Sequence, residues 1–220
     1  SLGIQDLSML KHWLAAFRLR TLPLAVSSII AGSALAWFHG AFQAPVLVLA
    51  LITAILLQIL SNLANDLGDH QHGTDNQERV GPQRAVQSGA ISPAAMRRAM
   101  IICGALAFAS GIALIITALG LSPVTLAFLL LGLLAIGAAV KYTFGRNPYG
   151  YAGLGDLSVL LFFGIVGVCG TYYLHTGYID TIIQLPAFGF GLLSTGVLNV
   201  NNLRDIRNDK VSGKITMAVR

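Results

Sequence analysis

Hydrophobic residues along this chain gather into long stretches that short polar segments separate. Each stretch comes close to about 20 residues, the length at which a helix crosses the hydrocarbon core of a bilayer. The stretches must be helices, because an isolated strand would leave its backbone groups unpaired in lipid. The pattern predicts six membrane-spanning helices, at about residues 22–39, 44–65, 96–119, 122–141, 153–174 and 181–204.

The segment before the first stretch has a different pattern. Leu7, Leu10, Leu14 and Phe17 recur at helical spacing among basic residues. A helix with one apolar and one basic face binds at a membrane surface. We therefore expect residues 1–21 to form a short amphipathic helix on the bilayer.

Composition agrees with a membrane protein. Of the 220 residues, 55% are hydrophobic and 10% are charged, whereas a soluble domain has about 25% charged residues. The mean hydropathy is +0.72. We predict an all-α polytopic bundle that forms one domain over residues 1–220. Cys103 and Cys169 both lie in apolar stretches, which favours buried thiols over a disulfide or a metal site.

The links between the stretches alternate in length and charge. The links near residues 40–43, 120–121 and 175–180 are short and carry no Lys or Arg. All 14 basic residues therefore lie on the opposite side of the membrane, with the longer links and the two ends of the chain. The positive-inside rule assigns that side to the cytoplasm. We expect a multi-pass protein of the inner (plasma) membrane with a cytoplasm-facing cavity, over which residues 66–95 form a lid.

Two acidic clusters end the second and the sixth stretch. The first contains Asp66, Asp69 and Asp75, and the second contains Asp205 and Asp209. These two stretches run in the same direction, so the clusters can face each other at equal depth. Spacings of three and four residues stack carboxylates on one helix face, where they repel one another unless a cation lies between them. Mg²⁺ characteristically uses one or two carboxylates together with substrate phosphates.

Asparagines accompany both clusters. Asn65 lies four residues before Asp69, and Asn201 lies four residues before Asp205. Each amide oxygen is a candidate metal ligand one turn deeper. The alternative for a single cluster is a solvated helix end, but two matched clusters at helix C-termini, whose dipoles disfavour anions, point to a bound cation.

Basic residues near the clusters are candidates for binding phosphate. They are Arg84, Lys141, Arg146 and Lys214. Arginine and lysine beside Mg²⁺ can clamp phosphoryl oxygens and stabilise a departing diphosphate. Taken singly, each also fits an orientation charge or a side chain that snorkels to lipid headgroups.

The start of the fifth stretch adds aromatic and acidic candidates. Tyr142 lies between the two basic residues of the preceding link, and Tyr149 opens the stretch. Asp156 lies close to the membrane, where it can orient a polar substrate, act as a base, or pair with Lys141 or Arg146.

The acidic clusters resemble those of the UbiA-type intramembrane aromatic prenyltransferases. The family's first motif is Asn-Asp-x-x-Asp-x-x-x-Asp and its second is Asp-x-x-x-Asp. This chain has Asn65-Asp66-x-x-Asp69, with Gly73 in the place of the third Asp and Asp75 two residues later. The second motif matches fully at Asp205 and Asp209. The resemblance implies that Asp69, Asp205 and Asp209 are catalytic through bound Mg²⁺.

Within the family, the chain looks like the branch that prenylates 1,4-dihydroxy-2-naphthoate. The similar stretches are Arg18-Leu19-Arg20-Thr21-Leu22-Pro23, Leu60 to Asp66, Asn147-Pro148-Tyr149-Gly150-Tyr151, Gly153-Leu154-Gly155-Asp156 and Asn201 to Asp205. This implies that Arg20 and Tyr149 contact substrate, that Arg146 lies near the diphosphate, and that Asp156 acts on the aromatic substrate. It also implies nine spans, so we expect a chain truncated at its C-terminal end.

The implied reaction is transfer of a polyprenyl group from polyprenyl diphosphate to the naphthoate, with loss of CO₂, giving demethylmenaquinone. A second reading keeps the family but changes the acceptor to 4-hydroxybenzoate or a tocopherol-type ring. A third reading is a cation-coupled transporter, because intramembrane carboxylates also form ion sites. Charges confined to one side of the membrane favour the enzyme.

Overall fold

The computed structural model describes residues 2–75 and 81–220, and within these ranges the elements are all helical. The α-helices are α1 (Leu2–Phe17), α2 (Leu22–Phe38), α3 (Ala44–Gln71), α4 (Pro93–Leu119), α5 (Pro123–Lys141), α6 (Gly155–Val159), α7 (Thr171–Thr176), α8 (Gln184–Arg204) and α9 (Ile206–Val211). The short 3₁₀ helices are η1 (Leu19–Thr21), η2 (Tyr149–Ala152) and η4 (Thr181–Ile183), and η3 (Leu160–Gly170) is a π-helix.

Six helical segments are long and apolar enough to cross a membrane. They are centred on α2, α3, α4, α5, the continuous rod α6–η3–α7, and α8. The prediction of an all-α bundle with six spans is therefore confirmed. The helix α4 begins at Pro93, three residues before the predicted start of the third span, because Ser92 accepts a hydrogen bond from the Ala95 amide and Pro93 takes the first helical position.

The predicted end of the second span also differs from the structure. The second span continues to Gln71 rather than ending at residue 65, so the first acidic residues lie on α3 itself. The helix continues through this polar sequence because its last turns are buried: Leu67 and Asp69 are almost completely inaccessible to solvent. The link that follows is correspondingly shorter than expected, and residues 76–80, which include Arg79, lie outside the described part of it.

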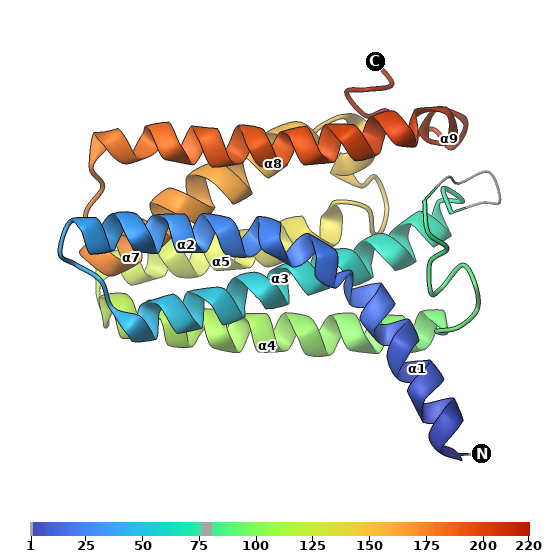
Figure 1. The fold of residues 1–220 in the computed structure, drawn as a ribbon, viewed down its shortest axis with the longest axis horizontal. Helices are drawn as coiled ribbons and strands as arrows, with labels where there is room; N and C mark the ends of the chain where they lie inside the picture. The colour runs from blue at the N-terminus through green and yellow to red at the C-terminus, as the bar shows by residue number, and fades with distance from the viewer. Residues whose placement is uncertain (1, 76–80) are drawn as a thin grey trace.

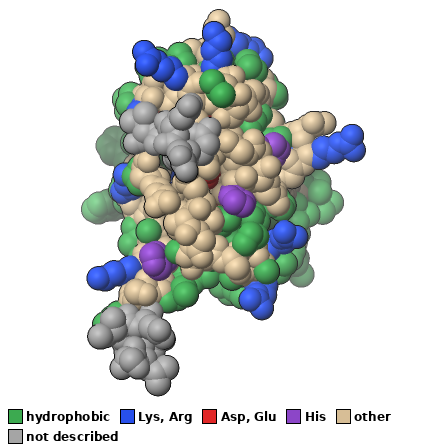
Figure 2. Space-filling view, turned by 90° about the vertical axis from the view of Figure 1, so that its right-hand side faces the viewer, with side chains coloured by type: hydrophobic (Ala, Val, Ile, Leu, Met, Phe, Trp, Pro, Cys, Tyr) green, Lys and Arg blue, Asp and Glu red, His purple; other side chains and the backbone are tan. Residues whose placement is uncertain are grey.

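The helices lie roughly along one axis (Figure 1), and both chain termini lie at the same end of the bundle. We call this the polar end; it carries the link from α3 to α4, the link from α5 to α6, and α9. Figure 2 looks onto the polar end and shows Lys and Arg side chains around it, with Asp and Glu side chains nearly hidden from view. The short links lie at the opposite end, which we call the far end.

The N-terminal helix projects away from the bundle at the polar end (Figure 1). It exposes Leu7, Leu10 and Leu14, as an amphipathic surface helix requires. The chain then turns at Arg18, whose φ of 50° is left-handed. Asn62 of α3 holds this turn in place by donating hydrogen bonds to the Phe17 carbonyl and the Thr21 hydroxyl, both at 2.9 Å.

Close backbone contact joins the fifth and the sixth span. A Cβ added to Gly164 of η3 would lie 2.6 Å from the Ala187 carbonyl oxygen and 2.9 Å from the Gly191 Cα. Glycine is therefore required at this crossing of η3 and α8. Small residues at such crossings allow helices in lipid to approach and gain van der Waals contact.

This contact predicts a difference between two Gly→Ala variants. Gly164→Ala should lower the free energy of unfolding by about 1–3 kcal/mol, because the methyl group overpacks the interface. Gly189→Ala, on the exposed side of α8 with nothing within 4 Å, should leave stability unchanged or raise it. Thermal unfolding in detergent measures both. Equal melting temperatures for the two variants would contradict the close crossing.

Candidate active site

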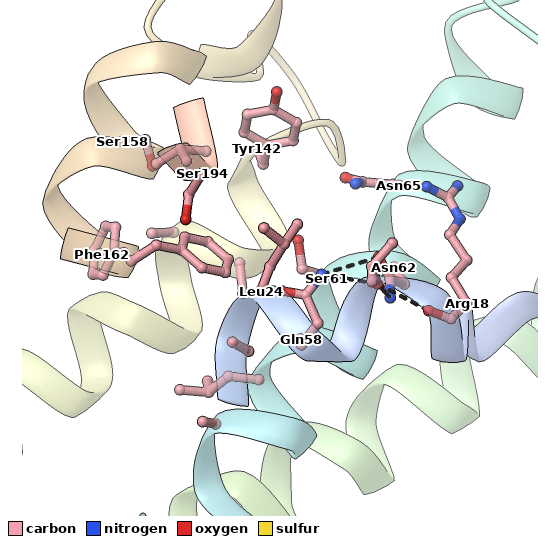
Figure 3. A pocket seen from close by; sticks show the side chains of 18 of the residues that line it. Arg18, Leu24, Gln58, Ser61, Asn62, Asn65, Tyr142, Ser158, Phe162 and Ser194 are labelled. Carbon is pink, nitrogen blue, oxygen red and sulfur yellow. Dashed lines mark hydrogen bonds between the residues drawn. The ribbon is translucent and has the colours of Figure 1, made fainter. Parts of the chain in front are cut away.

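A cavity of about 1110 Å³ runs through the bundle from the polar end toward the far end. Leucine, alanine and phenylalanine side chains make up most of its deep wall, while the charged lining residues lie at its polar end. Residues 82–85, from the link between α3 and α4, also line it, as expected of a segment that covers the mouth. Figure 3 shows part of the wall, with Gln58, Ser61 and Asn62 of α3 near Leu24 of α2.

Asp69 is the most connected acidic residue of the site. Its carboxylate binds the Arg84 guanidinium at 2.7 Å and accepts a hydrogen bond from the Tyr151 hydroxyl at 2.8 Å. The Lys214 amine lies 3.9 Å from the same carboxylate. Asp69 therefore collects cationic and donor groups from three separate links of the chain.

Lys214 also connects the two acidic clusters. Its amine lies 4.0 Å from the Asp209 carboxylate as well as 3.9 Å from Asp69. Both carboxylates are almost fully buried, and Lys214 itself is mostly buried. The ends of α3 and α9 thus meet around one positive charge at the cavity mouth.

Two carboxylates of the first cluster have other partners. Asp66 accepts hydrogen bonds from the backbone amides of Ala85 and Val86, each at 3.2 Å. Asp75 lies 3.3 Å from the Arg84 guanidinium and is not among the residues that line the cavity. In these contacts Asp66, which lines the cavity, anchors the covering link, and Asp75 supports Arg84. Their predicted role as metal ligands stays a prediction.

The asparagines and Asp205 are placed differently from one another. Asn65 lines the cavity, and its amide oxygen accepts a hydrogen bond from Thr143 at 2.7 Å. Asn201 is exposed and lines the cavity rim. Asp205 also lines the cavity and forms a two-point ion pair with Arg204.

The structure does not bring every predicted substrate contact to the cavity. Lys141 and Arg146 are exposed, lie outside the cavity lining, and contact each other through the Lys141 amine and the Arg146 carbonyl. Asp156 also lies outside the lining and accepts a hydrogen bond from Asn199 at 2.7 Å, which joins α6 to α8. The predicted roles of these three residues toward the substrates stay predictions.

The remaining predicted contacts do line the cavity: Arg20, Arg84, Tyr142, Tyr149 and Lys214. The Tyr149 hydroxyl bonds to the Ala138 carbonyl and to Ser158. Burial, the nearby Tyr149 and the charge of Asp69 raise the pKa of Tyr142, so its hydroxyl stays neutral. Tyr142 and Tyr149 pack edge to face, with ring centroids 5.4 Å apart.

Two residues that sequence reasoning did not assign belong to the site. Tyr151 links Asp69 to the C-terminal segment, since its ring lies under the Lys214 amine and its carbonyl accepts from the Ile215 amide. Burial and the charge of Asp69 raise the pKa of Tyr151, which keeps the donating proton in place. Arg18 lines the cavity from its left-handed turn. Both residues lie in stretches that resemble the family branch, but the resemblance did not assign them a role.

Electrostatic balance at the mouth depends on Arg84. Burial by itself lowers the pKa of the Arg84 guanidinium. The negative charges of Asp69 and Asp75 have the larger effect together, so the pKa is raised. Arg84 therefore remains a cation inside the site.

The donor groups suit a metal ion that is shared with a ligand. Within residues 2–75 and 81–220, no three His, Cys, Asp or Glu side chains gather closely enough to hold a metal alone. Mg²⁺ does not require such a cage, because it takes one or two carboxylates and completes its shell with phosphate oxygens and water. Asp69 and Asp209, which face the same amine, are oxygen donors of the right kind.

Comparison with known proteins identifies the family. The UbiA prenyltransferase family matches residues 25–220, so this chain belongs to that family. The 1,4-dihydroxy-2-naphthoate octaprenyltransferase of Haemophilus influenzae is 54% identical over 213 residues, which are 96% of this chain and 69% of the relative. The proteins of the same name from Escherichia coli and Mycobacterium tuberculosis are 51% and 42% identical, over 98% and 95% of this chain and 70% and 69% of theirs. No solved structure matches the chain significantly.

Family membership confirms the resemblance predicted from the acidic motifs. The chain is a multi-pass membrane enzyme that transfers a prenyl group from a prenyl diphosphate to an aromatic acceptor. Enzymes of this family generally depend on a divalent metal ion.

The contacts of Asp66 generate a prediction that separates anchoring from metal binding. Asp66→Asn replaces a carboxylate oxygen with an amide group that faces a backbone N–H, which should cost about 1–3 kcal/mol. Hydrogen exchange should then accelerate at Ala85 and Val86, with or without Mg²⁺. If exchange is unchanged and only metal affinity falls, Asp66 is a ligand and not an anchor.

Proposed function

We propose that this chain transfers a polyprenyl group from polyprenyl diphosphate to 1,4-dihydroxy-2-naphthoate, with loss of CO₂ and with Mg²⁺ as the metal. The observation that carries the proposal is the meeting of Asp69 and Asp209 around Lys214 at the mouth of an apolar cavity. The names of the relatives at 42–54% identity support the choice of acceptor.

The mouth of the cavity holds the diphosphate. When bound, a divalent cation neutralises charge on the diphosphate and polarises its bridging oxygen. Asp69 and Asp209 supply oxygen ligands, while Arg84 and Lys214 donate hydrogen bonds to phosphoryl oxygens. These donors gain most as negative charge accumulates on the leaving group, so they lower the barrier to breaking the allylic C–O bond.

The apolar part of the cavity holds the isoprenoid and excludes water. Exclusion of water limits hydrolysis of the allylic cation before the ring attacks. The ring carbon that bears the carboxylate forms the new C–C bond. The carboxylate then leaves as CO₂, and its bonding electrons restore the aromatic ring.

The position of the basic residues supports an active site that faces the cytoplasm across the inner membrane. In the sequence, all 14 Lys and Arg lie on the side of the membrane that the polar end faces. Figure 2 shows Lys and Arg side chains around the polar end. The positive-inside rule places such an end in the cytoplasm.

Substitution of the two meeting carboxylates should abolish turnover. Asp69→Asn and Asp209→Asn each remove a negative charge that should bind the metal ion, so kcat/KM should fall by about 100-fold or more. Asp180→Asn, in the link at the far end, is the control and should remain active. The assay contains purified protein, Mg²⁺, a polyprenyl diphosphate and the naphthoate, with 4-hydroxybenzoate as a competing acceptor. Near-normal turnover by Asp209→Asn would exclude a site shared by the two clusters.

The orientation is tested by labelling single cysteines in intact cells. Phe42→Cys and Tyr178→Cys lie at the exposed far end and should react with a membrane-impermeant maleimide. Lys210→Cys, exposed at the polar end, should react only after the membrane is opened. Labelling of the Lys210 position from outside would place the active site on the other side of the membrane.

A further inference from the structure

Several hydroxyl side chains in the spans are bonded to their own helix. Ser28, Thr53 and Thr195 donate to the carbonyls of Ala25, Leu49 and Gly191, at 3.1, 2.8 and 2.9 Å. This arrangement satisfies a hydroxyl in a setting that offers no water. Such residues need no ligand.

Ser61 of α3 and Ser194 of α8 differ from this pattern. Among the described residues, neither hydroxyl has a hydrogen-bond partner, although both residues line the cavity. Ser194 is only 6% exposed. Thr171, on α7 toward the far end, also lines the cavity without a hydrogen-bond partner among the described residues. Hydroxyls that are open to a cavity can bond to a ligand that carries polar groups.

The depth of the two serines separates them from the diphosphate. Along α3, Ser61 lies about 12 Å below Asp69 at 1.5 Å per residue. Along α8, Ser194 lies about 16 Å below Asp205 by the same measure. Diphosphate oxygens held at the mouth by Arg84 and Lys214 do not reach that depth.

The surroundings of the two serines are suited to a flat ring. Leu24 and Phe162 also line the cavity and lie in the same region in Figure 3, with Ser158 and Tyr142 on the side of Ser194. Apolar and aromatic walls with a few placed polar groups are typical of small-molecule sites.

The isoprenoid cannot use these hydroxyls, because its chain has no hydrogen-bonding group. The aromatic acceptor carries two ring hydroxyls and must lie next to the allylic carbon, just below the diphosphate. We propose that Ser61 and Ser194 form the acceptor subsite and hydrogen-bond the ring hydroxyls of the dihydroxy aromatic substrate. This inference rests on the proposed function and names the residues that select its acceptor.

Steady-state kinetics with each substrate varied separately test the subsite. Ser61→Ala and Ser194→Ala should each raise the KM for 1,4-dihydroxy-2-naphthoate by about three- to tenfold, the value of one hydrogen bond. The KM for polyprenyl diphosphate and the Mg²⁺ dependence should stay unchanged. Ser28→Ala is the matched control: Ser28 lines the same cavity, but its hydroxyl is already bonded to Ala25. It should behave as the wild type.

Binding of 1-hydroxy-2-naphthoate, which lacks one ring hydroxyl, completes a thermodynamic cycle. Its affinity is measured by its fluorescence without donor and without metal. One of the two serine substitutions should not weaken binding of this analogue, because the analogue lacks the ring hydroxyl to which that serine would bond. The other should still weaken binding by the same factor as for the full acceptor.

Three outcomes would overturn the subsite. Both variants bind the two naphthoates as the wild type does, or both variants, and not just one, weaken the binding of the two naphthoates by equal factors, or the variants change the KM for the polyprenyl diphosphate instead. The last outcome assigns the serines to the donor. Failure of the wild type to bind or prenylate the naphthoate contradicts the proposed function itself, and is thereby distinguished from failure of the subsite alone.

Discussion

The structure depends on the compensation of buried negative charge at one end of an apolar bundle. Asp66, Asp69, Asp75 and Asp209 are each at most 8% exposed. Isolated carboxylates cannot persist in such a place, so each must have a cation or several hydrogen-bond donors. Arg84 and Lys214 provide the cations, and backbone amides of the covering link provide the donors for Asp66.

This compensation also organises the links at the polar end. Arg84 is drawn into the bundle by Asp69, and this places the residues on either side of it over the cavity. Lys214 and the Ile215 amide hold the C-terminal segment against Asp69 and Tyr151. The same positive groups that balance the carboxylates are suited to hold a diphosphate, so that one charge pattern serves both folding and binding.

Below the charged mouth, the cavity changes from charged to neutral polar and then to apolar. Asp69 and Asp209 lie at the mouth, Asn62, Ser61 and Ser194 lie deeper, and Leu114 and Leu174 line the wall toward the far end. This gradient matches the three chemical parts that meet in the proposed reaction: a diphosphate, a hydroxylated ring and a hydrocarbon tail. A hydrophobic tail binds by burial of area alone and needs no directional contacts.

Much of this protein was determined by its sequence alone. The six spans and the two acidic clusters at one end of the bundle follow from hydropathy and local spacing, because each depends on neighbours along the chain. The pairing of charges was decided only by tertiary structure. Asp66 and Asp69 are one helical turn apart and look equivalent in sequence, yet one anchors a link and the other binds Arg84 and Tyr151. Lys141 and Arg146 likewise look suited to phosphate but lie outside the cavity. Partners that come from distant parts of the chain set these roles, and no local pattern encodes which of them will meet.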